Sequence, residues 1–117
     1  MKNFRELKVW EKSHQLVLQI YEASSHFPDD EKFGLVSQIK RSASSVPANI
    51  AEGCGRGSDL DFARFIQIAI GSACESEYHI FLAKELGYID VQKWSDIDTN
   101  INEVKRMLIN LNKKLRS

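Results

Sequence analysis

Apolar residues recur every three or four positions along most of the 117-residue chain, which is the spacing of amphipathic helices. Three short segments rich in Pro, Gly, Asp or Ser interrupt this spacing, at residues 25–31, 53–59 and 86–92. The strict alternation of apolar and polar residues that is typical of strands does not occur. The pattern therefore predicts an all-α fold in one domain spanning residues 1–117, an up-down-up-down four-helix bundle with short connections.

The first and last segments each carry an apolar stripe along one helical face. In the first segment, one line of residues has a second line beside it: Leu7, Trp10, His14, Val17, Tyr21 and Ser24, flanked by Leu16, Ile20, Ala23 and Phe27. In the last segment, the stripe is a heptad repeat: Trp94, Ile97, Ile101, Val104, Leu108, Leu111 and Leu115. We expect each helix to pack through its stripe.

The third segment is apolar on more than one face. Ser58 is suited to cap its start, and Asp61 lies three residues later, as in a weak capping box. Because its two stripes leave little surface for water, we predict a helix that is either central or shared with a second subunit. The stripes are Phe62, Ile66, Ala69, Ala73, Ile80 and Ala83, and Phe65, Ile68, Ser72, Glu75, His79, Leu82 and Leu86; Ile70, Tyr78 and Phe81 lie off both and favour the shared helix.

The second segment keeps its apolar register through a proline. An internal proline removes a backbone hydrogen bond and costs roughly 3 kcal/mol, yet the residues next to Pro47 are small enough to let the chain bend. We predict one helix from residue 30 to about residue 54, kinked near Pro47 and ending in a left-handed cap at Gly53 or Gly55. The register is Leu35, Ile39, Ala43, Val46, Ile50 and Cys54.

A line of polar residues runs beside this register. Ser and Asn are poor helix formers, so their use in place of Lys and Glu indicates a contact surface. We expect it to meet Ser72 and Glu75 of the third helix, where residues 69–73 supply small side chains, or a neighbouring subunit; a polar ligand pocket is the alternative. The line is Gln38, Ser42, Ser45, Asn49, Glu52 and Arg56, and Arg41 lies next to it.

Candidate chemistry is sparse. The segment GCGRGSD lacks the spacing and the preceding strand of phosphate-binding loops. Glu75, His79 and Glu52 offer a possible metal site, but a di-iron bundle needs an ExxH pair on each of two helices, which this chain lacks. Cys54 and Cys74 are too few for a zinc site, and we expect both to be small buried thiols. The prediction is a protein with no catalytic residues and no cofactor.

Sixteen basic and sixteen acidic residues cancel, so net charge favours neither nucleic acid nor a membrane surface. No secretory signal and no run of eighteen apolar residues occurs, and we expect a cytoplasmic protein without membrane contact. Two local groups of basic residues are candidate phosphate contacts: Lys40, Arg41, Arg56 and Arg64 around Pro47, and Lys105, Arg106, Lys113, Lys114 and Arg116 near the end.

Three segments in order resemble the bacterial four-helix-bundle proteins encoded in intervening sequences of 23S ribosomal RNA genes. They are FRELKVWEKSHQL, FPDDEKFGLVSQIKRSASSVPANIAEGCGR and FARFIQIAIGSACESE, and together they cover nearly the whole chain. The most specific positions are Phe27, Pro28, Glu31, Gly34, Leu35, Gln38, Arg41, Ser45, Val46, Pro47, Asn49, Ile50, Ala51, Glu52, Gly53, Gly71, Ser72 and Glu75.

This resemblance implies a ring-like homo-oligomer, typically a pentamer, with no established catalytic activity. A similar protein is the accessory variability determinant of diversity-generating retroelements, a basic pentameric ring that binds nucleic acid; this chain differs in being neutral overall. We expect a non-enzymatic homo-oligomer, and one hypothesis for its function is an accessory role at RNA or DNA. The alternatives are a scaffold that binds no nucleic acid and, ranked lower, a bundle that binds a small ligand or a metal.

Overall fold

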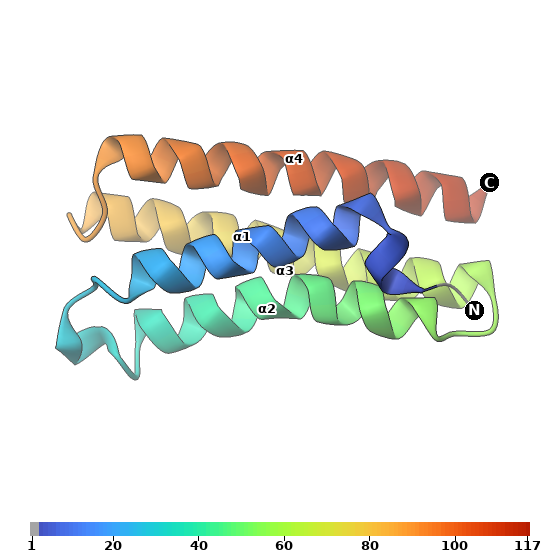
Figure 1. The fold of residues 1–117 in the computed structure, drawn as a ribbon, viewed down its shortest axis with the longest axis horizontal. Coiled ribbons are helices and arrows are strands. Elements are labelled where there is room, and N and C mark those ends of the chain that lie inside the picture. The colour runs from blue at the N-terminus through green and yellow to red at the C-terminus, as the bar shows by residue number, and fades with distance from the viewer. Residues whose placement is uncertain (1–2) are drawn as a thin grey trace.

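Four long helices lie side by side in the computed structural model, which describes residues 3–117 (Figure 1). A short 3-10 turn, η1 (Phe4–Glu6), precedes α1 (Lys8–Ser24), and a second, η2 (Asp29–Glu31), precedes α2 (Leu35–Cys54). They are followed by α3 (Asp59–Glu85) and α4 (Val91–Arg116). The predicted all-α four-helix bundle is confirmed, and it measures 43 × 24 × 20 Å.

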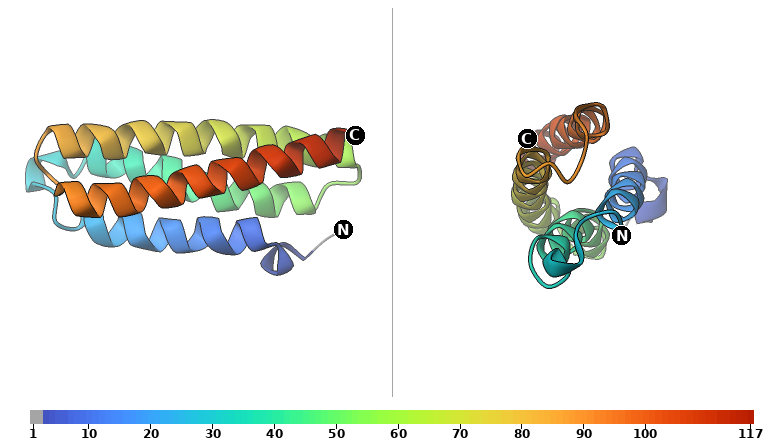
Figure 2. Two further views of the ribbon diagram at one scale, coloured as in Figure 1. Left: turned by 90° about the horizontal axis from the view of Figure 1, so that it is seen from above. Right: turned by 90° about the vertical axis from the view of Figure 1, so that its left-hand side faces the viewer.

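The helices alternate in direction, and each packs against two neighbours (Figure 2). The α2–α3 and α3–α4 contacts are the most extensive, and the α1–α4 contact is the least. Both chain ends and the α2–α3 turn lie at one end of the bundle, and the α1–α2 and α3–α4 connections lie at the other (Figure 1). Across residues 3–117, none of the helices is both long and apolar enough to cross a membrane.

The stripe predicted for α1 faces the core, and its two lines are buried to different extents. Leu16, Ile20 and Ala23 are buried, whereas Trp10 is only half-buried and Tyr21 is 42% exposed. Lys40 of α2 sits over the Tyr21 ring. The line from Leu16 to Phe27 is therefore the more deeply buried one, and the line from Leu7 to Ser24 flanks it.

The start of α2 differs from the prediction, because the helix begins at Leu35 and not at residue 30. The Glu31 side chain folds forward, and its Oε1 accepts the backbone N–H of Leu35 at 3.1 Å. Its Oε2 accepts the Tyr88 hydroxyl at 2.8 Å, which ties the start of α2 to the α3–α4 connection. A Cβ at Gly34 would lie 2.8 Å from Glu31 Oε1, so a side chain there would push this carboxylate away from Leu35.

The end of α2 falls at Cys54 with Gly55 as its cap, within the predicted range. Gly55 has φ −84°, so the expected left-handed cap is wrong at this position. The left-handed glycine is Gly87, with φ 79°, after α3. There the Tyr88 N–H reaches the Ala83 carbonyl at 2.9 Å, as in a Schellman motif.

The packed interior is continuous through Pro47, which is itself buried inside α2. Val46 directly before it and Ile50 and Cys54 after it are all buried, as the register predicted. The α4 heptad likewise places Ile97, Ile101, Val104 and Leu108 in the core, each at most 1% exposed.

Gly53 of α2 leaves no room for a side chain beside α3. A Cβ there would lie 2.7 Å from Phe62 Cδ1 and 3.0 Å from Phe65 Cβ, whereas a Cβ at Gly71 would meet nothing within 4 Å. We predict that Gly53→Ala lowers the free energy of unfolding by about 1 kcal/mol or more, because overpacking outweighs the better helix propensity of Ala.

Gly71→Ala is the control, and it should raise the free energy of unfolding by up to about 1 kcal/mol. Urea unfolding at one protein concentration measures both variants. Equal effects of the two substitutions would contradict the close approach at Gly53.

Candidate functional site

Hydroxyl groups join α2 to α3 at two levels, one helical turn apart. Ser76 Oγ donates to Ser42 Oγ at 2.9 Å, and Ser72 Oγ donates to Ser45 Oγ at 2.9 Å. Ser42 and Ser76 are buried, and they also contact main-chain carbonyls of their own helices, at 3.3 Å to Ile39 and at 2.9 Å to Ser72. These short side chains let the two helices approach closely while every hydroxyl keeps a partner.

His79 extends the inner pair of serines toward the surface. Its Nδ1 lies 3.2 Å from Ser42 Oγ, and its Nε2 lies 3.6 Å from Glu75 Oε2. Burial lowers the pKa of His79 below its ordinary value, and the nearby Glu75 carboxylate offsets only part of this effect. A neutral His79 with its proton on Nε2 accepts the Ser42 hydroxyl at Nδ1, which gives a chain from Ser76 through Ser42 to His79.

A groove of about 500 Å³ lies over these serines, between α2 and α3. Its rim offers one cation, Arg41, and one anion, Glu75, and its floor is formed by serine hydroxyls. The residues that line the groove are all polar or charged, so it is suited to bind polar groups. The lining residues are Gln38, Arg41, Ser42, Ser45, Ser72 and Glu75.

Of the remaining polar residues predicted for this surface, Arg56 reaches α3 through Asp61 at 3.8 Å and the Phe65 ring at 4.5 Å, and the other two bond elsewhere. Asn49 Nδ2 donates to the main-chain carbonyl of Ser45 at 2.8 Å and to its Oγ at 2.9 Å, so it reaches α3 only through Ser45. Glu52 pairs with Arg56 Nη2 at 3.0 Å and is solvent-facing. Sequence reasoning missed Ser76, whose four-residue spacing from Ser72 was the available signal.

Ser42, His79 and Glu75 follow the order of hydroxyl, imidazole and carboxylate found in hydrolase triads. However, Ser42 is only 5% exposed and lies in the middle of α2, where helical hydrogen bonds occupy the backbone N–H groups. Such a helix presents no free N–H groups toward a reacting carbonyl. The arrangement therefore fits helix–helix packing better than nucleophilic catalysis.

The metal-site alternative gains no support from the geometry. Glu52 pairs with Arg56 and not with Glu75 or His79. In the part of the chain that the structure describes, no three His, Cys, Asp or Glu side chains are grouped as metal ligands. Cys54 is buried as expected, but Cys74 is exposed, because it lies on the side of α3 that faces away from the core.

Exposed apolar side chains recur along the outside of α3, with Arg64, Gln67 and Glu75 between them. Half of the large apolar side chains that stay exposed in residues 3–117 lie on this helix or directly after it. A solvated helix face is normally charged, so this surface is unusual for a helix in contact with water. We call it the outer face of α3, and its exposed members are Leu60 (62%), Ile68 (51%), Tyr78 (58%) and Phe81 (43%), with Leu86 (49%) following the helix.

Several of the predicted phosphate-binding cations are engaged within the bundle. Lys105 Nζ donates to Glu77 Oε1 at 2.7 Å, and this bond holds the pKa of Glu77 below its ordinary value. Arg64 pairs with Asp61 at 3.0 Å. The other engaged cations are Arg56, which pairs with Glu52 and Asp61, and Lys40, which sits over the Tyr21 ring. Within residues 3–117, no ion pair holds Arg41, Arg106, Lys113, Lys114 or Arg116.

The family model described as 23S rRNA-intervening sequence protein matches residues 5–110. The chain belongs to this family. A solved structure from Bacteroides thetaiotaomicron, described as a protein with unknown function from the S23 ribosomal protein family, has the same fold with a TM-score of 0.83. It is 30% identical, and the match covers 90% of this chain and 98% of that one. No curated protein matches the chain.

Burial of His79 leads to a prediction for pH. Because the pKa of His79 is lowered in the folded state, the unfolded state binds a proton more readily. The neutral imidazole makes its full contribution to the free energy of unfolding above the ordinary histidine pKa of about 6.5. This contribution is lost as pH falls toward the lower pKa of His79 in the folded state. We predict that the wild type loses free energy of unfolding between about pH 7.5 and about pH 5, and that His79→Gln loses less.

Urea unfolding across this range measures the effect, and the range stays above the ordinary pKa of the carboxylates. His26→Gln is the matched control, because His26 is exposed just after α1 and its ring bonds to the exposed Glu22. It should follow the wild type. A His79→Gln profile parallel to that of the wild type would contradict this account of the buried imidazole.

Proposed function

We propose that this chain is a non-enzymatic homo-oligomer whose subunits associate through the outer face of α3 and the adjoining α2–α3 groove. The observation that carries the proposal is the row of exposed apolar side chains on α3, among them Leu60, Ile68 and Tyr78. Two sides of α3 are covered by α2 and α4 within one chain. A third apolar side is expected on a helix that is also covered by a neighbouring subunit.

The groove supplies the directional part of the same contact. Arg41 and Glu75 stand on its rim with opposite charges, and Gln38 adds an amide. Polar side chains of a neighbour that paired with these groups would fix the register of two subunits, which an apolar surface alone does not do. A specific interface combines buried apolar area with polar contacts that fix how the two subunits are aligned.

The number of subunits is inferred from the family. The resemblance to the 23S rRNA intervening-sequence proteins implies a closed ring, typically of five copies. A ring requires one face of a subunit to meet a different face of the next, with a rotation that closes. We therefore propose a pentamer of about 67 kDa, which is five times the 13.4 kDa chain.

Sedimentation equilibrium tests the assembly. We predict that the wild type is larger than the 13.4 kDa monomer at micromolar concentration, and that Ile68→Glu weakens association at least about tenfold, because a charge on this face loses its water on contact. Leu18→Glu on α1 is the matched control, since Leu18 is 52% exposed and Ile68 is 51% exposed.

The control should leave the mass unchanged, and circular dichroism establishes that both variants fold. A wild type that sediments as a monomer would overturn the proposal of assembly. Equal weakening of association by Ile68→Glu and Leu18→Glu would show that the outer face of α3 is not the interface.

A second candidate function is an accessory role at RNA or DNA. The observation that favours it is the group of exposed cations on the last turns of α4, Lys113, Lys114 and Arg116, which form no ion pair within residues 3–117. Phosphate contacts release counterions, so binding at about 50 mM salt should weaken steeply by about 200 mM. A titration of labelled RNA and duplex DNA measures this, and affinity that did not fall with salt would contradict phosphate contacts.

A further inference from the structure

The fold separates charges that cancel in the sequence. The midpoints of the four helices divide the described chain into a terminal half, residues 3–15, 45–71 and 104–117, and a connection half, residues 16–44 and 72–103. The terminal half holds both chain ends and the α2–α3 turn, and the connection half holds the other two connections (Figure 1). Ten basic and five acidic residues fall in the terminal half, against five basic and eleven acidic in the connection half. With histidine neutral, the two halves carry about +5 and −6 at neutral pH.

Ion pairs reduce this separation only in part. Lys12 and Lys105 pair with carboxylates of the connection half, Glu103 at 3.2 Å and Glu77 at 2.7 Å. Arg56 and Arg64 are paired inside the terminal half. Six further cations of this half have no ion pair within residues 3–117: Arg5, Lys8, Arg106, Lys113, Lys114 and Arg116.

The cations of α4 form the densest part of this positive surface. Arg106 and Lys113 are both exposed and lie seven residues apart, which is two turns or about 10 Å along one face. Lys114 is exposed beside Lys113, and no acidic residue follows Glu103 in the chain. A ligand along this face would meet several positive charges and no carboxylate of α4.

Aromatic side chains near this end are engaged with one another. Phe4 and Trp10 meet edge-to-face at 4.9 Å, and His14 stacks on Trp10 at 5.1 Å. Arg5 covers the Phe4 ring at 4.7 Å. A platform for stacked bases needs open ring faces, so these rings do not match a base-reading surface. The positive surface instead suits a ligand recognised through its charge.

We propose that the terminal half of the bundle binds the phosphate backbone of nucleic acid, and that the connection half repels it. This inference rests on the proposed role at RNA or DNA and adds the surface and the contacted group. A nucleic acid backbone presents closely spaced negative charges, about one per 1.7 Å in duplex DNA, which extended rows of cations can neutralise together. Backbone contacts carry no sequence information, so binding should depend little on base sequence.

The charge separation also gives an assembly two unlike faces. In a closed ring whose axis runs along the helices, every terminal half lies on the same side. The positive charges of all copies then add on one face, and the negative charges add on the other. Nucleic acid would then bind only to the positive face of the ring, because the negative face repels its phosphates.

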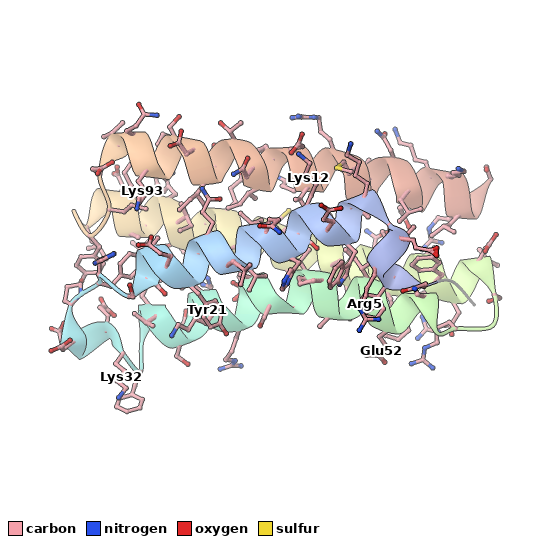
Figure 3. All side chains as sticks on the ribbon, in the orientation of Figure 1. Arg5, Lys12, Tyr21, Lys32, Glu52 and Lys93 are labelled. Carbon is pink, nitrogen blue, oxygen red and sulfur yellow. The ribbon has the colours of Figure 1, made fainter. Side chains whose placement is uncertain are left out.

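Two charge-reversal variants test the inference. Lys113→Glu/Lys114→Glu changes the terminal half. Lys32→Glu/Lys93→Glu changes net charge equally in the connection half, where Lys32 and Lys93 lie far from Arg5 (Figure 3). Fluorescence anisotropy measures binding of labelled single-stranded RNA and duplex DNA of mixed sequence, from about 50 to about 200 mM salt. Sedimentation without nucleic acid checks that both variants assemble as the wild type does.

We expect the terminal-half variant to reduce the slope of log affinity against log salt by about 2, one for each lost phosphate contact. The control should keep the wild-type slope. Equal losses in the two variants would overturn the location while leaving nucleic-acid binding in place. No wild-type binding at about 50 mM salt would overturn both the location and the nucleic-acid role. Salt-sensitive stacking of the protein on itself, without bound nucleic acid, would assign the separated charges to end-to-end contact and overturn the proposal.

Discussion

The close approach of α2 and α3 is the constraint on which the rest of the structure depends. Gly53 has no room for a Cβ beside Phe62, and the Ser42–Ser76 and Ser45–Ser72 hydrogen bonds span the same interface. Larger side chains at these positions would separate the helices, and apolar ones would give up the bonds that fix their register. Ser42 and Ser45 of the polar line on α2 thus bond to α3 within the chain, and residues of the same line also border the groove.

This packing decides which surface of α3 is left outside. With α2 on one side and α4 on the other, the third side carries Ile68 and Tyr78 into solvent, next to Arg41 and Glu75 of the groove. The antiparallel helices also bring the basic ends of the chain to one end of the bundle. One arrangement therefore produces an apolar side, a polar groove and a charged end.

The sequence predicted the helix registers well, because the α4 heptad and the line from Leu35 to Cys54 depend only on local spacing. It failed where a distant or long side chain decided the outcome. Glu31 replaced the first turn of α2 by bonding forward to Leu35, and Tyr21 of α1 stays 42% exposed beneath Lys40 of α2. The charge separation could not be predicted from the net charge, because the net charge does not depend on which ends of the helices the fold brings together. Of the candidate site, Ser45 and Ser72 meet as their spacing suggested, whereas Glu52 pairs with Arg56 of the α2–α3 turn.

The central claim is that the outer face of α3 is covered by another subunit, and tyrosine nitration of the native protein tests it most directly. Within a single chain, Tyr78 is 58% exposed and Tyr21 on α1 is 42% exposed, so a free bundle should be modified at Tyr78 at least as readily as at Tyr21. Mass spectrometry of the digested protein compares the two sites. The account predicts that Tyr21 reacts well before Tyr78; reaction of Tyr78 as fast as Tyr21 would contradict it.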